Sequence, residues 1–205
     1  MLLSAAFVAV VAAGALVAVN RPSASSSAGS GPPAGPYKGS EPPGEIHAAD
    51  FTLRDYRGRL VSMRAQRGKI VLLSFVDSKC MESCPIVASV MAQAFRRLTP
   101  SLRRRTEAIV ISVSPKVDTP RSVRRFLARR HALALSYLLG TPSQLRPVWK
   151  AYGILSALDS GNADIHSSDV RVFDRDGVWV STQHAGVDLT AANLGADAET
   201  ALKRS

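Results

Sequence analysis

Residues 70 to 85 read IVLLSFVDSKCMESCP, and this stretch decides the fold class. Residues 70–76 form a nearly continuous apolar run, which is typical of a β-strand buried on both faces. Cys80 and Cys84 follow, and Pro85 comes directly after the second cysteine. Proline is favoured at the first position of a helix, so Cys84 is predicted to be the N-cap of a helix that begins at Pro85. A buried strand that leads through two cysteines into a helix indicates an α/β domain.

The two cysteines are predicted to form one site. The helix start would place backbone N–H groups and the positive end of the helix dipole beside them. Such surroundings lower the pKa of a thiol, and the thiolate is the form that binds metals and attacks disulfides. The spacing alone is compatible with a redox dithiol, a pair of metal ligands or a structural disulfide. Because two sulfur atoms leave most divalent sites incomplete, a metal site needs a third ligand.

Strand and helix patterns alternate along the rest of the domain. Further strands are predicted at 50–55, 59–63, 107–113, 135–139, 170–173 and 178–181, and helices at 85–98, 119–131, 142–152 and 189–202. The DRDG sequence at residues 174–177 predicts a hairpin turn. Strand–helix–strand–helix followed by a hairpin and a last helix is the order of a thioredoxin-like α/β fold, whose parallel strands are joined by right-handed crossovers.

The amino-terminal part of the chain has a different composition. Residues 1–19 are uncharged and apolar apart from Ser4 and Gly14, and a membrane span needs about 20 apolar residues. We therefore predict an uncleaved transmembrane helix there, with a cleaved signal peptide as the alternative. Residues 20–45 are rich in Ser, Gly and Pro and predict a flexible linker. The domain of residues 46–205 is then expected on the extracytoplasmic side of the cell membrane.

Basic residues outnumber acidic ones by 26 to 16, which gives a net charge of +10. Arginines cluster at 96–97, 103–105, 124–125 and 129–130. These clusters are either solvated helix faces or a docking surface for an acidic protein or anionic lipids. Nucleic acid is not expected as a partner, because aromatic residues are not interleaved with the basic ones.

Four histidines are candidates for a third ligand: His47, His131, His166 and His184. His131 is expected to end an arginine-rich helix. His166 lies just before the predicted hairpin, in a loop that could reach the helix start. Spacing alone does not choose among the four.

Several motifs together resemble the Sco/SenC family of copper chaperones. They are RGKIVLLSF (67–75), CMESCP (80–85), SPKVDTP (114–120), WKAYG (149–153) and IHS (165–167) ahead of FDRDG (173–177). The resemblance covers about residues 46–202. It implies a thioredoxin-like fold and copper, as Cu(I) or Cu(II), held by Cys80, Cys84 and His166. Thiolates favour Cu(I) and imidazole accommodates both oxidation states, which agrees with that ligand set.

The resemblance also implies a function. A membrane-anchored chaperone would receive copper from an upstream donor and deliver it to the binuclear copper centre of cytochrome c oxidase, or to another cuproprotein, with a thiol reductant as a further partner. The alternative is an enzyme, a thiol–disulfide oxidoreductase with Cys80 and Cys84 as its redox pair. A thiol peroxidase is a third candidate, but Asp77 stands where its Thr-x-x-Cys pattern would require threonine.

The sequence departs from the family pattern at two places. Ser114 stands where DPxxDTP begins with aspartate, while Asp118 is kept and is expected to cap the following helix. Asp77, Ser78 and Lys79 replace the usual aromatic–threonine region before the first cysteine. Lys79 would favour a thiolate at Cys80 and oppose a cationic metal.

Overall fold

The computed structural model describes residues 35–154 and 168–204. Its strands are β1 (Thr52–Asp55), β2 (Leu60–Ser62), β3 (Ile70–Val76), β4 (Thr106–Ser112), β5 (Ser136–Leu139), β6 (Asp169–Phe173) and β7 (Trp179–His184). Its helices are η1 (Arg64–Gln66), α1 (Ser83–Arg97), α2 (Pro100–Arg104), α3 (Pro120–Ala128), α4 (Pro142–Tyr152) and α6 (Ala191–Lys203).

The seven described strands form one mixed sheet in the order β2-β1-β5-β4-β3-β6-β7. The central strands β3, β4 and β5 are parallel, and every other neighbouring pair is antiparallel. The segments after β3, β4 and β5 therefore all leave the sheet at the same edge. That edge carries the cysteines and the amino-terminal ends of α1, α3 and α4.

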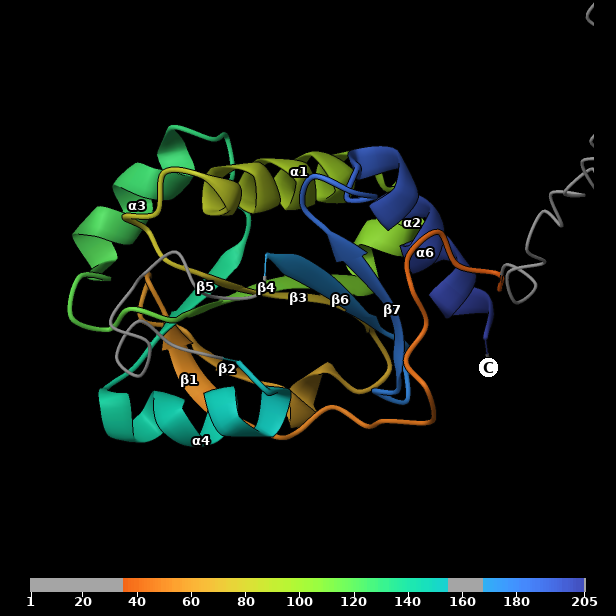
Figure 1. Cartoon of the computed structure of the whole chain (residues 1–205), viewed down its shortest axis with the longest axis horizontal. Coiled ribbons are helices and arrows are strands. Elements are labelled where there is room, and N and C mark those ends of the chain that lie inside the picture. The colour runs from red at the N-terminus through yellow and green to blue at the C-terminus, as the bar shows by residue number, and fades with distance from the viewer. Residues whose placement is uncertain (1–34, 155–167, 205) are drawn as a thin grey trace, which may run out of the picture. The chain divides into compact units, whose positions relative to one another are not determined.

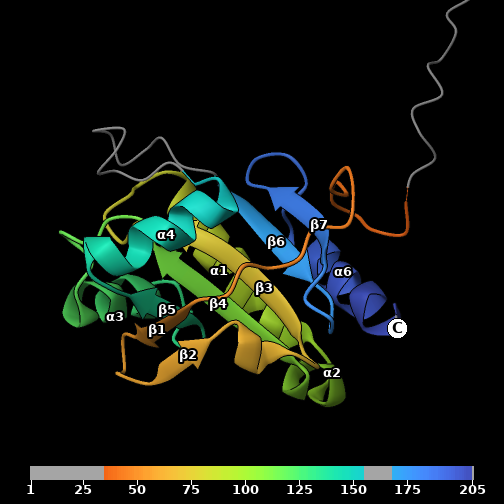
Figure 2. The same ribbon diagram turned by 90° about the horizontal axis from the view of Figure 1, so that it is seen from below.

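Helices cover both faces of the sheet, as Figures 1 and 2 show. Helices α1, α3 and α6 lie on one face, and α4 lies on the other. Strand β3 is buried along its whole length because it has a helical layer on each side. Its alternate residues enter two separate cores, Leu72 packing on the α1 side and Leu73 on the α4 side.

Threonine side chains begin α3 and α4, two of the helices at the carboxyl edge of the sheet. Thr119 accepts from the backbone N–H of Ser122, and Thr141 accepts from that of Gln144. In both cases the third helical residue completes a capping box, and a proline occupies the first helical position. These local signals fix where α3 and α4 start, and they agree with the low cost of proline in a first turn.

The segment from residue 37 to residue 48, here called the N-terminal strap, lies along β7. Ser40 pairs with Thr182 and His47 pairs with Val178. The backbone N–H groups of Lys38 and Gly39 donate to the Asp197 carboxylate at 2.6 and 3.1 Å. Part of the predicted linker is therefore packed against the domain, which begins before residue 46.

Most predicted elements are confirmed, with small shifts at their ends. Strand β3 and helix α4 have the predicted bounds, and both hairpins form. Helix α3 is shorter than predicted and ends before His131, whose φ of 51° is left-handed. Short α2 and η1 were not predicted. No helix in the described ranges is both long and apolar enough to cross a membrane, and the predicted anchor at residues 1–19 lies outside those ranges.

Candidate functional site

The two cysteines lie on the connection from β3 to α1. Cys80 is 4% exposed and Cys84 is 1% exposed, and both are thiols rather than halves of a disulfide. Helix α1 begins at Ser83, with Glu82 as its N-cap residue. The prediction that Cys84 is the N-cap is therefore wrong, and Cys84 lies inside the first turn. Pro85 is the third residue of the helix. A proline is tolerated there because the N–H groups of a first helical turn have no acceptor within the helix.

Burial dominates the chemistry of Cys84. Removal of its thiol from water raises its pKa well above the ordinary value, and the neighbouring Cys80 and Asp77 act in the same direction. A hydrogen bond from the backbone N–H of Asp77, at 3.5 Å from Cys84 Sγ, opposes this shift only in part. The expectation of a lowered thiol pKa is therefore wrong for Cys84, because desolvation outweighs the helix terminus.

Asp77 shapes the turn that precedes Cys80. Its carboxylate accepts from the backbone N–H of Lys79 at 2.6 Å, a local turn typical of aspartate. The side chain is 1% exposed, and its second oxygen, Oδ2, has no hydrogen-bond partner among the described residues. Asp77, a departure from the family pattern, thus stabilises the loop and brings a buried carboxyl group close to the thiols.

Asp118 fastens this loop to the sheet. Its Oδ1 accepts from the backbone N–H of Ser78 at 3.0 Å. Its Oδ2 accepts from the Ser112 hydroxyl at 2.6 Å and lies 2.8 Å from the Tyr137 hydroxyl. Burial raises the pKa of Asp118, although these hydrogen bonds act against the shift. The expectation that Asp118 caps the next helix is wrong, since Thr119 does so.

The third predicted ligand, His166, lies outside the described residues. The first described residue after it, Ser168, donates from its hydroxyl to that of Ser83 at 2.5 Å. Ser83 directly precedes Cys84, so the chain re-enters the described structure beside the start of α1. No group of three or more His, Cys, Asp or Glu in the described ranges is arranged to hold a metal ion.

The other histidines are spread over the domain. His47 lies on the strap, beside Glu45, and His131 follows the end of α3. His184 ends β7 opposite Asp169, at the same edge of the sheet as the cysteines but two strands away from β3. None of these three is brought together with both cysteines in a metal-binding group.

A family profile described as SCO1/SenC matches residues 39–198. The chain belongs to the SCO1/SenC family. Among curated relatives, "Protein SCO2 homolog, mitochondrial" from Bos taurus is 28% identical over 65% of this chain, and the match spans 52% of the bovine protein.

Solved Sco structures agree with this assignment. Bradyrhizobium japonicum ScoI with copper bound is 25% identical over 77% of this Sco/SenC chain and 100% of its own, with a TM-score of 0.64. BsSco, described as a cytochrome c oxidase assembly protein with a disulfide switch, is 22% identical over 81% of this chain and 99% of its own, with a TM-score of 0.66. These likenesses confirm the predicted thioredoxin-like fold.

The donor set of this Sco/SenC protein fits a soft metal. Two sulfur donors lie in one loop and first helical turn, and thiolates select Cu(I) more strongly than hard cations such as Mg²⁺. The described residues supply no third ligand, so they do not form a closed tetrahedral site of the structural zinc type. The two sulfur donors are thus compatible with copper.

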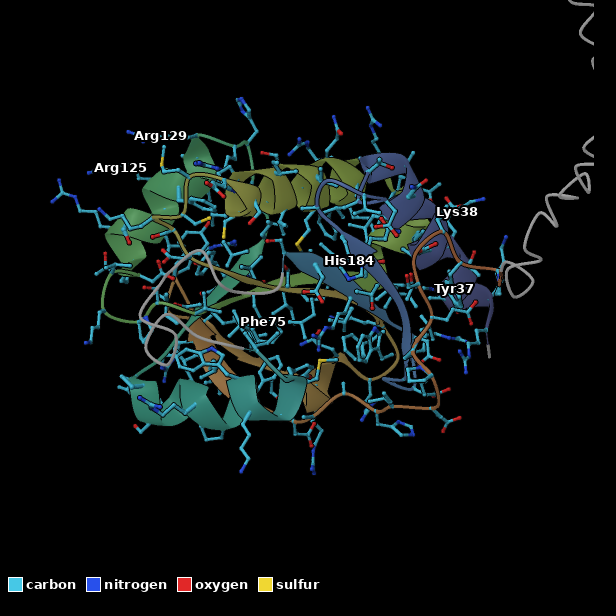
Figure 3. All side chains as sticks on the ribbon, viewed as in Figure 1. Tyr37, Lys38, Phe75, Arg125, Arg129 and His184 are labelled. Atoms are coloured by element: carbon cyan, nitrogen blue, oxygen red, sulfur yellow. The ribbon has the colours of Figure 1, made fainter. Side chains whose placement is uncertain are left out.

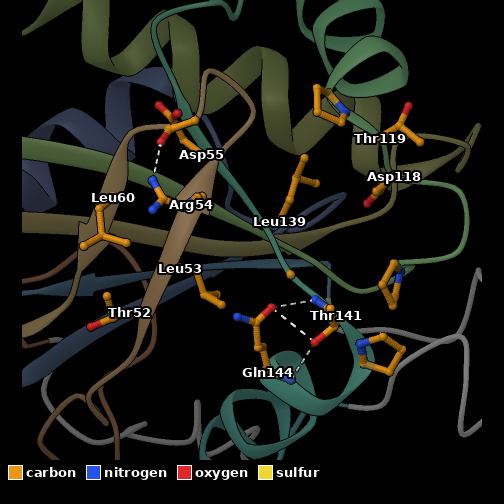
Figure 4. Close-up of a pocket in the computed structure, with 15 residues that line it drawn as sticks. Thr52, Leu53, Arg54, Asp55, Leu60, Asp118, Thr119, Leu139, Thr141 and Gln144 are labelled. Carbon is orange, nitrogen blue, oxygen red and sulfur yellow. Dashed lines mark hydrogen bonds between the residues drawn. The ribbon is translucent and has the colours of Figure 1, made fainter.

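An open cavity of about 810 Å³ has Asp118 among its lining residues (Figure 4). It is lined by the β1–β2 hairpin and by the starts of α3 and α4, including Leu53, Thr119 and Thr141. Neither cysteine lines it. This cavity is therefore not part of the cysteine site.

Proposed function

We propose that this protein is a copper chaperone that binds copper through Cys80, Cys84 and His166. The observation that carries the proposal is the pair of adjacent, reduced thiols at the start of α1, in a chain that belongs to the SCO1/SenC family. Copper is bound in the Bradyrhizobium relative, which is aligned over its whole length. Copper is cargo here, so a site with few ligands suits both its capture and its release.

The position of Ser168 supports His166 as the third ligand. Ser168 is hydrogen-bonded to Ser83, next to Cys84. Two residues of fully extended chain span at most about 7 Å. The short separation in sequence between residue 166 and Ser168 therefore supports an imidazole ligand supplied to the start of α1.

The recipient that we propose is the binuclear copper centre of cytochrome c oxidase, as the description of BsSco suggests. Incoming cysteine ligands of the recipient would displace Cys80 and Cys84 one at a time, so that copper is never released to water. We further propose that residues 1–19 anchor the chain in the membrane and hold the domain outside the cytoplasm.

A second candidate function is thiol–disulfide exchange. The proximity of Cys80 to Cys84 favours it, because one sulfur can attack a target disulfide and the other can resolve the mixed disulfide. The buried Cys84 suits the resolving role, and Cys80 would attack. The two functions are compatible, since the cysteines of a copper recipient must be reduced before they bind the metal.

His166→Ala is expected to weaken Cu(I) binding to the reduced full-length chain, while the dithiol remains able to form a disulfide. The loss should exceed the roughly 10- to 100-fold that removal of an outer-shell partner costs, because a direct ligand is lost. Competition with a Cu(I) chelator under anaerobic conditions, with metal analysis of the isolated protein, measures both affinity and stoichiometry.

His47→Ala is the matched control, since His47 lies on the strap and is expected to leave copper binding unchanged. One copper per wild-type chain that is held equally well by His166→Ala would contradict the three-ligand site. No tight copper in the wild type, together with reduction of a model disulfide by the thiols, would instead establish the exchange function.

A further inference from the structure

The loop and helix start that carry the cysteines also carry exposed apolar side chains. Met81 lies between the two cysteines and is 83% exposed. Ile86, the fourth residue of α1, is 48% exposed. The sulfur atoms themselves are almost fully buried. Exposed apolar side chains therefore stand next to both buried thiols in the sequence, on the loop and on the first turns of α1.

Basic side chains lie beside the cysteine loop, on α3 and on the loop itself. The hydroxyls of Ser78 and Ser122 lie 3.3 Å apart, so the cysteine loop touches the first turn of α3. Exposed Arg121, Arg125 and Arg129 follow at intervals of four, which places them along one side of that helix. Exposed Lys79 lies within the loop itself. We call these four residues the basic rim.

The electrostatics of Arg130, just after the end of α3, agree with this proximity to the thiols. Burial and the charge of Arg129 lower the pKa of Arg130, whereas Cys84 and Cys80 act on it in the opposite direction, which requires the guanidinium to be near both. Arg130 itself is packed over the Phe126 ring at 4.1 Å. Figure 3 shows Arg125 and Arg129 extending outward from α3 into solvent.

No member of the basic rim forms an ion pair with another described residue. The ion pairs found in residues 35–154 and 168–204 use other basic residues, and none includes a member of the rim. Glu82 is the exposed acidic residue of the loop. Four cations with no ion pair in the described part of the chain, beside exposed apolar side chains, form a surface that is complementary to an acidic one.

We propose that the basic rim docks an acidic protein surface, which brings the partner's own thiol or metal ligand to Cys80 and Cys84. The proposal rests on the proposed role of these thiols in transfer to a partner. A protein fits this surface better than a lipid bilayer does. Methionine and arginine are enriched in protein interfaces, whose centre is apolar and whose border is polar, and the buried sulfur atoms need a partner that can insert a reactive group.

Electrostatic docking makes a prediction that requires no copper. The reduced, copper-free, full-length chain is mixed with peptides that carry one cysteine as a mixed disulfide with nitrothiobenzoate. A cysteine thiolate of the protein displaces the nitrothiobenzoate thiolate, forms a protein–peptide disulfide, and the released anion is followed by its absorbance. Glutamate-rich, glutamine-rich and lysine-rich peptides of equal length serve as probes.

The glutamate-rich peptide is expected to react about tenfold or more faster than the lysine-rich one at low salt, because steering raises association rates by factors of this order. The ratio should fall toward one as salt shortens the Debye length to a few ångströms. In the double variant Arg125→Glu with Arg129→Glu, the preference should vanish or reverse, while the rate with the glutamine-rich peptide stays unchanged.

The matched control is Arg124→Glu with Arg104→Glu, which changes the net charge equally. Arg124 is exposed on the same helix, about 100° around its axis from Arg125, and Arg104 ends α2. The control must retain the wild-type ratio. Equal rates for all three peptides, or an equal loss of preference in the control, would overturn the proposal.

Anionic lipid is the competing occupant. If the rim variant loses binding to phosphatidylglycerol vesicles, relative to phosphatidylcholine vesicles, but keeps the peptide preference, the rim is a lipid-binding surface and the proposal is wrong. The failures of the two proposals are distinguishable. If the wild type binds no copper tightly but keeps its preference for the glutamate-rich peptide, the chaperone function is wrong and the docking surface stands.

Discussion

Asp118→Ala is expected to lower the free energy of unfolding by about 2–4 kcal/mol and to loosen the cysteine loop. The substitution removes the acceptor of the Ser78 N–H, which holds the loop to the sheet, and it deprives the buried Ser112 hydroxyl of its hydrogen-bond acceptor. Urea unfolding measures the stability. Alkylation of Cys80 by iodoacetamide measures the loop, and the rate should rise because Ser78 is no longer held.

Asp118→Asn is the informative comparison. The Tyr137 hydroxyl lies 2.7 Å from the Val76 carbonyl oxygen and 2.8 Å from Asp118 Oδ2, yet it has a single proton to donate. A protonated Asp118 removes the conflict, because Tyr137 can then accept from it and donate to Val76. An asparagine amide donates in the same way and keeps Oδ1 for Ser78, but its nitrogen cannot accept from the Ser112 hydroxyl. This variant should therefore lose about 1–2 kcal/mol, which is less than the alanine variant loses.

The raised pKa of Asp118 has a consequence for stability against pH. A carboxyl group whose pKa is raised by folding binds more protons in the folded state, so its stabilisation is complete below the unfolded pKa of about 3.9 and is lost as pH rises through the folded pKa. Asp118→Asn should lack this decline. Parallel pH series of urea unfolding compare the two, and a wild type whose stability falls no more steeply than that of the asparagine variant would contradict the buried acid.

Asp197→Ala is expected to cost about 3–5 kcal/mol, the largest effect that we predict. Asp197 is fully buried, and its carboxylate accepts from the Lys38 and Gly39 N–H groups, from the Ser181 hydroxyl at 2.6 Å and from the Gln183 amide at 2.7 Å. Alanine leaves all four donors without their acceptor. Thermal or urea unfolding measures the loss, and hydrogen exchange at Lys38 and Gly39 should accelerate.

Glu199→Ala provides the control, because Glu199 is an exposed acid on the same helix. It should change stability by no more than about 0.5 kcal/mol. Equal effects of the two substitutions, or unchanged exchange at Lys38 and Gly39 in Asp197→Ala, would show that the carboxylate does not hold the strap.

Local patterns allowed most of the fold to be predicted. The apolar run of β3 leaves no alternative to a buried strand, and the bounds of α4 were predicted correctly although Pro147 lies inside the helix. The start of α1 was misplaced because a proline was taken as the first helical residue. The chain instead turns at Glu82, where no side chain provides a cap.

The site was predicted less completely, because its environment depends on residues distant in sequence. The cysteines could be identified from their spacing, but the burial that raises the pKa of Cys84 comes from packing against the whole α1 side of the sheet. Asp118 reaches back 40 residues to Ser78, a contact that no local pattern signals. Asp197 reaches back 159 residues to Lys38, and its position inside an amphipathic helix gives no hint of that role.

The N-terminal strap also protects the sheet from uncontrolled growth. The outer side of β7 would otherwise present unpaired N–H and C=O groups, which are a template for the strands of other molecules. Ser40 exchanges two backbone hydrogen bonds with Thr182, and Ile46 accepts from Trp179, so this border of the sheet is occupied. At the opposite border, β2 is only three residues long. A chain whose strap has detached from β7 would be prone to edge-to-edge aggregation. Asp197 opposes this, because its carboxylate holds the strap in place.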